Sequence, residues 1–259
     1  MTARVLVFDS GVGGLSVVGE MRARMPGLQI DYAADDAFRP YGSKSAEALR
    51  ERLPRLVWEL REATGAGLVV VACNTASVTA LRGIRAALAV PVVGVVPAVK
   101  PAASATRTGA MAVLGTPATV RQDYVDELVS DFASDHEVLR VGSVALVDVA
   151  EGKLAGRAVD MEAVRREVEP ILRARGIDTV VLACTHFPLL RTELETAMPG
   201  VRLIDSGAAI ARRVESLLPG VANAASREDV ALLVGREAGQ ARRQAFGAYG
   251  FGRVVPLLA

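Results

Sequence analysis

The sequence predicts an α/β fold built from two pseudo-symmetric domains, each a mostly parallel sheet flanked by helices. Short β-branched runs alternate with longer helical patterns, which is typical of βαβ units whose parallel sheet is covered on both faces. With 259 residues, of which 51% are hydrophobic, the chain can bury one large core or two modest ones. Sequence segments of the first half also recur in similar form in the second half, which favours two domains over one.

Seven short apolar runs are expected to be strands. They are Val5–Phe8, Gln29–Ala33, Leu68–Ala72, Val92–Val95, Ala110–Leu114, Thr179–Ala183 and Arg202–Ile204. Helices are expected where apolar residues recur every three or four positions, over Leu15–Arg24, Ser45–Ala63 and Met161–Arg175. Pro54 lies inside the second of these helices, which should therefore kink or end near that residue.

The internal repeat is clearest around the two cysteines. LVVVACNTAS at 68–77 resembles TVVLACTHFP at 179–188, and VLVFDSG at 5–11 resembles MAVLGTP at 111–117. The two offsets, 184 − 73 = 111 and 111 − 5 = 106, nearly agree. Pro97 and Pro101 interrupt regular structure between the halves. We therefore expect one domain over residues 1–97 with 208–259, and a second over 98–207.

Charge and cysteine content exclude several classes of function. The chain has 30 basic and 29 acidic residues, so no overall field favours nucleic acid or an anionic membrane surface. The N-terminus lacks the features of a signal peptide, and no apolar run reaches the roughly 18 residues of a membrane span. Two cysteines are too few for a disulfide scaffold or a metal cluster. We expect a soluble cytoplasmic protein with reduced thiols and no metal.

Both cysteines are predicted to lie at strand ends, where ligands of open α/β sheets bind. A single cysteine at such a place is most often a small buried core residue. Here Cys73 and Cys184 occupy the same position of the repeat, each with polar donors beside it and a helix start after it. Such a matched pair, one from each side of a cleft between the domains, would suit an acid and a base that act on opposite faces of one carbon. The pattern indicates racemisation or epimerisation.

Other residues near these strand ends allow more than one interpretation. His186 could assist the thiolate of Cys184, or it could cap a helix or pack in the core. Asp9 could cap a helix, contact a substrate amino group, or help Cys73 accept a proton.

The glycine turn DSGVGGLSV at 9–17 supports a rival prediction. It nearly matches the dinucleotide-binding fingerprint, and Asp31 lies at about the spacing of the ribose-binding acid. However, Ser16 stands where the fingerprint has a third glycine or alanine. A nicotinamide-dependent oxidoreductase therefore remains one alternative, and a non-catalytic amino-acid-binding protein is another.

Seven sequence blocks occur together in a fixed order over roughly residues 5–215. They are DSGVGGLSV at 9–17, RPYGSKS at 39–45, ACNTAS at 72–77, VVPAVKPA at 95–102, LGTPAT at 114–119, ACTHFPLL at 183–190 and IDSGAAIA at 204–211. This set closely resembles the glutamate racemases of the aspartate/glutamate racemase family. Aspartate racemases usually follow the second cysteine with Thr-Glu, so Thr185-His186 points to glutamate.

The resemblance implies cofactor-independent interconversion of L- and D-glutamate, with the D-isomer supplying peptidoglycan biosynthesis, and it suggests a homodimer. Cys73 would remove the α-proton of D-glutamate while Cys184 returns a proton to the opposite face. Asp9 would assist Cys73, and His186 would assist Cys184. The resemblance also places substrate contacts at Asp9, Ser10, Tyr41, Gly42, Asn74, Thr75, Thr116, Thr119, Thr185 and His186.

The chain departs from the family pattern in one segment. Family members often carry there a glutamate that supports the second thiol, and this chain reads GSVALVDVAEG at 142–152. Glu151 is the candidate for that glutamate, and Asp148 is the alternative.

The chemistry itself demands a closed site. The Cα–H of an amino acid is far less acidic than a thiol, so the enzyme must stabilise a carbanion electrostatically and exclude water. We therefore expect hinge motion near residues 95–100 and 205–210, where the chain crosses between the domains.

Overall fold

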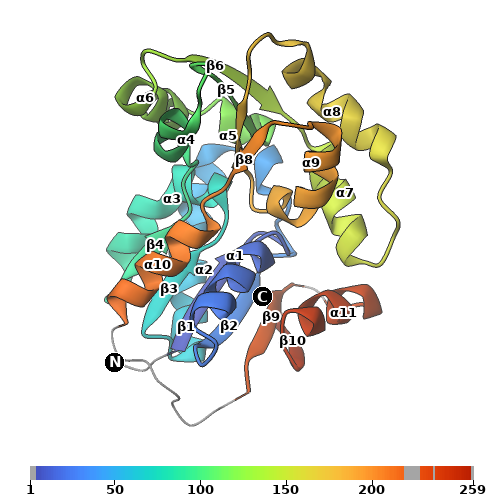
Figure 1. Ribbon diagram of the computed structural model, residues 1–259. Helices are drawn as coiled ribbons and strands as arrows, with labels where there is room; N and C mark the ends of the chain where they lie inside the picture. The colour runs from blue at the N-terminus through green and yellow to red at the C-terminus, as the bar shows by residue number, and fades with distance from the viewer. Residues whose placement is uncertain (1–3, 219–227, 236, 258–259) are drawn as a thin grey trace. The chain divides into compact units, whose positions relative to one another are not determined.

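The computed structural model (Figure 1) describes residues 4–218, 228–235 and 237–257. The chain divides into two compact units, one formed by Met1–Val95 with Gly207–Ala259 and the other by Val96–Ser206. Each unit contains a parallel sheet flanked by helices, so the predicted α/β class is confirmed. None of the described helices is both long enough and apolar enough to cross a bilayer.

The first unit contains a six-stranded sheet in the order β10-β9-β2-β1-β3-β4, with every pairing parallel. Its strands are β1 (Arg4–Asp9), β2 (Gln29–Ala34), β3 (Leu68–Val71), β4 (Val92–Gly94), β9 (Val230–Val234) and β10 (Arg253–Leu257). Every residue of β1 and β3 is buried, as expected for central parallel strands covered on both faces. Because β1 and β3 are neighbours, their carboxyl ends bring Asp9 and the segment around Cys73 together.

Helices cover this sheet on both faces. They are α1 (Leu15–Arg24), α2 (Ala46–Thr64), α3 (Asn74–Ala87), α10 (Gly207–Leu217) and α11 (Gln240–Ala248), with a short 3-10 helix, η1 (Tyr41–Ser43). Helices α1 and α10 lie side by side, and α2 packs against α3 (Figure 1). Helix α2 begins after Ser45, whose hydroxyl accepts the Ala48 N–H, and ends at Gly65 in the left-handed conformation. It continues through Pro54, so the alternative that it ends there is wrong.

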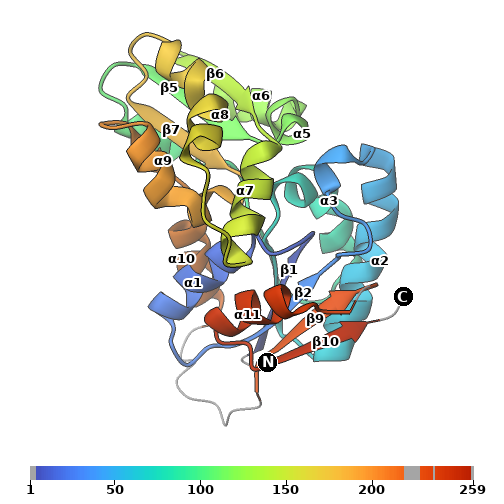
Figure 2. The same cartoon turned by 90° about the vertical axis from the view of Figure 1, so that its right-hand side faces the viewer.

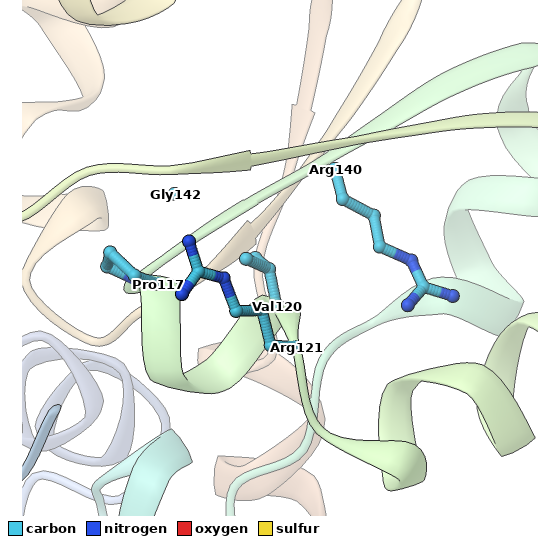
Figure 3. Close-up of a pocket in the computed structure, with 5 residues that line it drawn as sticks. All are labelled: Pro117, Val120, Arg121, Arg140 and Gly142. Carbon is cyan, nitrogen blue, oxygen red and sulfur yellow. The ribbon is translucent and has the colours of Figure 1, made fainter. Parts of the chain in front are cut away.

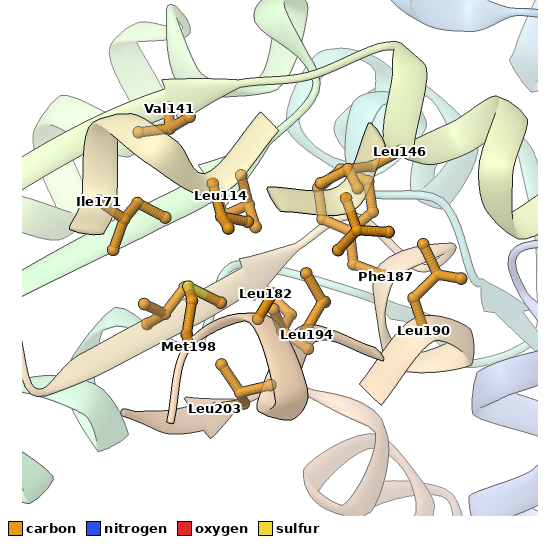
Figure 4. Packing of buried hydrophobic residues seen from close by; sticks show 14 of the residues in the cluster. Leu114, Val141, Leu146, Ile171, Leu182, Phe187, Leu190, Leu194, Met198 and Leu203 are labelled. Atoms are coloured by element: carbon orange, nitrogen blue, oxygen red, sulfur yellow. The ribbon is translucent and has the colours of Figure 1, made fainter. Parts of the chain in front are cut away.

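The second unit contains a four-stranded parallel sheet in the order β6-β5-β7-β8. Its strands are β5 (Ala110–Gly115), β6 (Glu137–Gly142), β7 (Thr179–Ala183) and β8 (Arg202–Ile204). Its helices are α4 (Val99–Ala105), α5 (Pro117–Val120), α6 (Asp123–Phe132), α7 (Ala145–Leu154), α8 (Met161–Arg173), η2 (Phe187–Leu190) and α9 (Arg191–Ala197). Leu146, Leu182 and Phe187 pack together in its core (Figure 4), and Cys184 belongs to the same buried cluster.

All seven predicted strands are present, and three observed strands escaped prediction. Strand β6 lies at a sheet edge and is mostly part-exposed, so its residues lack a continuous apolar pattern. Strand β10 is also an edge strand and carries Pro256, which is tolerated there because an edge strand has an unpaired side. Strand β9 reads VALLV, and so short an apolar run does not distinguish strand from helix.

Candidate active site

We call Cys73 and the groups around it, Asp9, Ser10, Asn74 and Tyr32, the Cys73 half-site. Cys73 follows β3 in an extended conformation and directly precedes the first residue of α3. It is a free thiol and only 6% exposed. The first turn of a helix presents unpaired N–H groups and the positive end of its dipole, which favour a thiolate or a bound carboxylate. The local fold therefore supports anionic chemistry at this thiol.

Asp9, the last residue of β1, has a fully buried carboxylate. Its Oδ1 accepts the Ser10 N–H at 2.7 Å, and its Oδ2 accepts the Gly14 N–H at 2.6 Å. The Tyr32 hydroxyl lies 3.3 Å from Oδ2. Buried carboxylates require such donors, and those from the main chain cannot rotate away. Asp9 thus closes the turn that precedes α1, and the N-cap residue of that helix is Gly14.

Ser10 lies between this carboxylate and the thiol. Its hydroxyl oxygen is 3.4 Å from Asp9 Oδ1 and 3.8 Å from Cys73 Sγ. Asn74 lies at the start of α3, and its buried Oδ1 has no hydrogen-bond partner in the structure. Native proteins seldom leave a buried acceptor unsatisfied. The Asn74 oxygen can therefore accept a hydrogen bond from a bound ligand.

Tyr41 and Gly42 belong to η1, in the same unit as Cys73. The buried Tyr41 hydroxyl donates to Asp35 Oδ2 at 2.8 Å, and the Arg52 guanidinium holds both oxygens of Asp35 at 2.7 and 2.8 Å. Burial, and then the Asp35 carboxylate, raise the pKa of Tyr41 well above its ordinary value. The phenol therefore keeps its proton and donates a hydrogen bond to Asp35.

We call Cys184, Thr185, His186 and Glu151 the Cys184 half-site. The first three residues follow β7 directly and are 6–7% exposed. Cys184 Sγ lies 3.8 Å from His186 Nδ1, and His186 Nε2 lies 3.3 Å from Glu151 Oε1. A thiol, an imidazole and a carboxylate arranged in this order form a path along which a proton can move. Asp148, the alternative to Glu151, is exposed.

Glu151 is positioned through its neighbours on α7. The Ser143 hydroxyl accepts the Leu146 N–H at 3.0 Å near the start of the helix. Two residues beyond Glu151, Lys153 Nζ donates to the Leu189 carbonyl at 2.9 Å and to Glu193 at 2.8 Å. These contacts tie α7 to η2 and α9, the elements that follow His186.

Thr116 and Thr119 bind each other in the second unit. The Thr116 hydroxyl caps α5 by accepting the Thr119 N–H at 3.2 Å, and the two hydroxyl oxygens lie 2.9 Å apart. Thr119 is fully buried, whereas Thr116 is partly exposed. At least one of these two predicted substrate contacts therefore has a structural role as well.

A cavity of about 410 Å³ opens beside α5 and is lined by Pro117, Val120, Arg121, Arg140 and Gly142 (Figure 3). It contains none of the predicted site residues. Arg140 pairs with Asp126 at 2.5 Å, and the side chains of Arg121 and Arg140 extend in opposite directions. The two guanidinium groups therefore do not converge on one ligand.

The rival dinucleotide prediction fails at Asp31. Its carboxylate is fully buried, pairs with Arg4 at 2.6 Å and accepts the Val230 N–H at 3.1 Å. A carboxylate held in this way joins strands and is not presented to a ribose. Among the described residues, no group of three or more His, Cys, Asp or Glu side chains could hold a metal ion.

Sequence reasoning missed Tyr32 and the Asp35–Arg52 pair. One signal was present, because a tyrosine in a buried strand needs a hydrogen-bond partner for its hydroxyl. The identity of that partner depends on which loop folds over the strand end, and no local pattern contains that information.

The chain has two α/β units, and each contains a parallel sheet with a buried thiol after an interior strand. This combination points to a class of isomerase. The model of the Asp/Glu/Hydantoin racemase family matches residues 16–214, and the chain belongs to this family.

Several proteins similar to this chain are glutamate racemases. The glutamate racemase of Sphingopyxis alaskensis is 53% identical over 224 residues, which cover 85% of this chain and 84% of the relative. That of Pectobacterium atrosepticum is 48% identical, covering 85% and 78%. The crystal structure of Escherichia coli glutamate racemase, in complex with L-glutamate and the activator UDP-MurNAc-Ala, covers 98% of both chains at 43% identity, with a TM-score of 0.91. The resemblance seen in the sequence is confirmed.

Proposed function

We propose that this enzyme interconverts L- and D-glutamate without a cofactor, with Cys73 and Cys184 as its two acid–base groups. One observation carries the proposal: two buried cysteines that form no disulfide follow equivalent strands, and each has a polar side chain beside its sulfur, Ser10 at Cys73 and His186 at Cys184. Glutamate is the substrate class because the curated relatives at about 50% identity are glutamate racemases.

The reaction requires one proton to leave and another to arrive. With D-glutamate, the Cys73 thiolate takes the Cα proton and becomes a thiol, which leaves a carbanion. The Cys184 thiol gives its proton to the opposite face of that carbon and becomes a thiolate. With L-glutamate the two cysteines exchange roles. Each turnover thus moves the enzyme between two protonation states, and proton exchange with solvent, or reaction of the opposite enantiomer, restores the first.

The carbanion needs stabilisation that water cannot supply. The N–H and hydroxyl donors that follow the strand ends, from Ser10, Asn74, Thr75, Thr116 and Thr185, are suited to the two carboxylates of glutamate. For both thiols to act on one carbon, the two units must close on the substrate and exclude water. Hinges near residues 95–100 and 205–210 are part of the proposal.

A cytoplasmic location and a homodimer belong to the same proposal. Both cysteines must stay reduced to act as acid and base, and the cytosol keeps thiols reduced. The product D-glutamate would supply peptidoglycan biosynthesis. Size-exclusion chromatography with light scattering tests the homodimer.

The experiment that tests the function uses purified, reduced protein with no added cofactor. Circular dichroism follows each glutamate enantiomer separately, and mass spectrometry follows deuterium uptake at Cα from heavy water. We expect both enantiomers to reach the same racemic mixture, and Cys73→Ala and Cys184→Ala each to abolish racemisation.

Other outcomes would support the alternatives. Binding of glutamate without any change in optical rotation would indicate an amino-acid-binding protein. Tight binding of NAD(H) without deuterium uptake would indicate an oxidoreductase.

A further inference from the structure

We infer that Tyr32 is a positioning residue for Asp9, and that Phe246 and Phe251, from the C-terminal segment, hold the Tyr32 ring in place. The inference deepens the proposed function and rests on it, because it assigns Asp9 the task of supporting Cys73. Its consequence is that a segment beyond residue 214, where the family match ends, contributes to the Cys73 half-site.

The Tyr32 hydroxyl faces two acceptors of the same turn. It lies 2.9 Å from the Gly11 carbonyl oxygen and 3.3 Å from Asp9 Oδ2. The turn from Asp9 to Gly14 also carries Ser10, whose hydroxyl lies 3.8 Å from Cys73 Sγ. One phenol proton is therefore shared between the carboxylate and the main chain of the loop that places Ser10 beside the thiol.

The ring of Tyr32 is enclosed by aromatic side chains. Its centroid lies 5.3 Å from that of Phe246 and 5.9 Å from that of Phe251, in edge-to-face geometry, and the two phenylalanines lie 6.0 Å apart. All three side chains are at most 2% exposed. Edge-to-face packing fixes a ring more specifically than apolar burial alone. The trio therefore fixes the direction in which the hydroxyl points.

The aromatic trio joins three elements of the first unit. Tyr32 lies on β2, Phe246 on α11, and Phe251 between α11 and β10. Strand β9 pairs with β2, and Figure 2 shows β9, β10 and α11 gathered beside β2. Arg22 adds a cation–π contact, 5.1 Å above the Phe251 ring. The C-terminal segment is thus built onto the strand that carries Tyr32.

Gly14 shows how closely the hydroxyl is fitted. A Cβ at this position would lie 2.8 Å from the Tyr32 hydroxyl and 2.9 Å from the Ala72 Cβ. Both distances are too short for real contacts, so only glycine lets the turn approach the phenol. The Gly14 N–H in turn donates to Asp9 Oδ2, the same oxygen that Tyr32 faces.

The phenol stays protonated in this environment. Burial, followed by the Asp9 carboxylate, raises the pKa of Tyr32 well above its ordinary value, and the Cys73 thiolate acts in the same direction. Arg242 opposes these effects but does not outweigh them. At any pH at which the enzyme operates, Tyr32 is therefore a hydrogen-bond donor and not a general base.

The test is Tyr32→Phe, which removes the hydroxyl and keeps the ring among its aromatic neighbours. The equilibrium constant of a racemase is one, so kcat/KM must fall equally in both directions. The loss of one neutral hydrogen bond predicts a fall of roughly threefold to tenfold. The informative measurement is the primary isotope effect on kcat/KM with 2-deuterated D-glutamate and with 2-deuterated L-glutamate.

Only the Cys73 step should become slower. The isotope effect should therefore rise for D-glutamate, from which Cys73 takes the proton. It should fall for L-glutamate, from which Cys184 takes the proton while Cys73 only gives one to the carbanion. A merely structural defect would move both effects together or neither. Phe246→Leu should give the same opposed shifts at smaller size. Tyr249→Phe is the matched control, because it makes the same change at a half-buried tyrosine of the same C-terminal segment.

Equal shifts in both isotope effects, or none in a folded Tyr32→Phe variant, would overturn the inference. Failure of the proposed function has a different signature: Cys73→Ala would keep racemase activity, or the unmodified enzyme would give no primary isotope effect on either enantiomer. Near-ultraviolet circular dichroism and thermal unfolding establish that each variant is folded.

Discussion

The two half-sites support equivalent thiols in different ways. In the Cys73 half-site the carboxylate of Asp9 is fully buried and held by main-chain N–H groups, and a serine hydroxyl separates it from the thiol. In the Cys184 half-site an imidazole separates the thiol from Glu151, whose side chain is 20% exposed. A carboxylate held by the main chain thus lies behind the serine next to one thiol, and an imidazole, which can itself carry a proton, lies next to the other.

The local fold explains this difference. The turn after β1 passes through Gly11, Gly13 and Gly14, so its N–H groups can wrap around the Asp9 carboxylate. The chain after β7 continues instead through His186 into η2, and its partner carboxylate comes from α7. Two similar strand-end segments thus have different polar groups near their cysteines, because different elements follow or pack against them.

Among substitutions of Asp9, Glu151 and His186, replacing the imidazole is expected to have the largest effect. His186→Asn keeps a polar atom near the position of Nδ1 but cannot take up a proton. Loss of a general acid–base group costs about 10²- to 10⁴-fold in kcat. The isotope effect on kcat/KM should rise for 2-deuterated L-glutamate and fall for the D-isomer, the reverse of the Tyr32→Phe pattern. The same pattern for both variants would show that the half-sites do not divide the reaction by enantiomer.

Asp9→Asn should combine a catalytic loss with a loss of stability. An asparagine amide would direct its NH₂ group at the N–H of Ser10 or of Gly14, and one buried donor would lose its acceptor. That costs about 1–3 kcal/mol of unfolding free energy. Urea denaturation measures this loss, and we expect kcat to fall about 100-fold with it. An unchanged denaturation midpoint would contradict the view that this carboxylate is part of the fold.

How much of the fold and of the candidate site could be predicted from the sequence depends on how far apart in the chain the interacting residues lie. The repeat placed Cys73 and Cys184 at strand ends because strand and cysteine are adjacent in the chain. Asp9 and His186 were proposed for the same local reason. Tyr32 was missed, because Asp9, which its hydroxyl faces, and Phe246, which packs against its ring, lie 23 and 214 positions away along the chain. Edge strand β6 was missed because it is too exposed to show an apolar pattern.

Among the substitutions of Asp9, Glu151 and His186, Glu151→Gln should have the smallest effect, because Glu151 acts through His186 and is partly exposed. The amide keeps the shape of the side chain, and its oxygen can still accept from Nε2, but the negative charge that stabilises an imidazolium is lost. We expect kcat to fall about tenfold, because a hydrogen bond to a charged partner becomes one to a neutral partner. The unfolding free energy should not change measurably, because a partly exposed ion pair contributes little to stability. Asp148→Asn, on the same helix but exposed, is the matched control and should leave kcat unchanged. If Asp148→Asn lowered kcat more than Glu151→Gln did, the second thiol would depend on the other carboxylate. The comparison of the two half-sites would then have to be made with Asp148, instead of Glu151, as the carboxylate that supports Cys184.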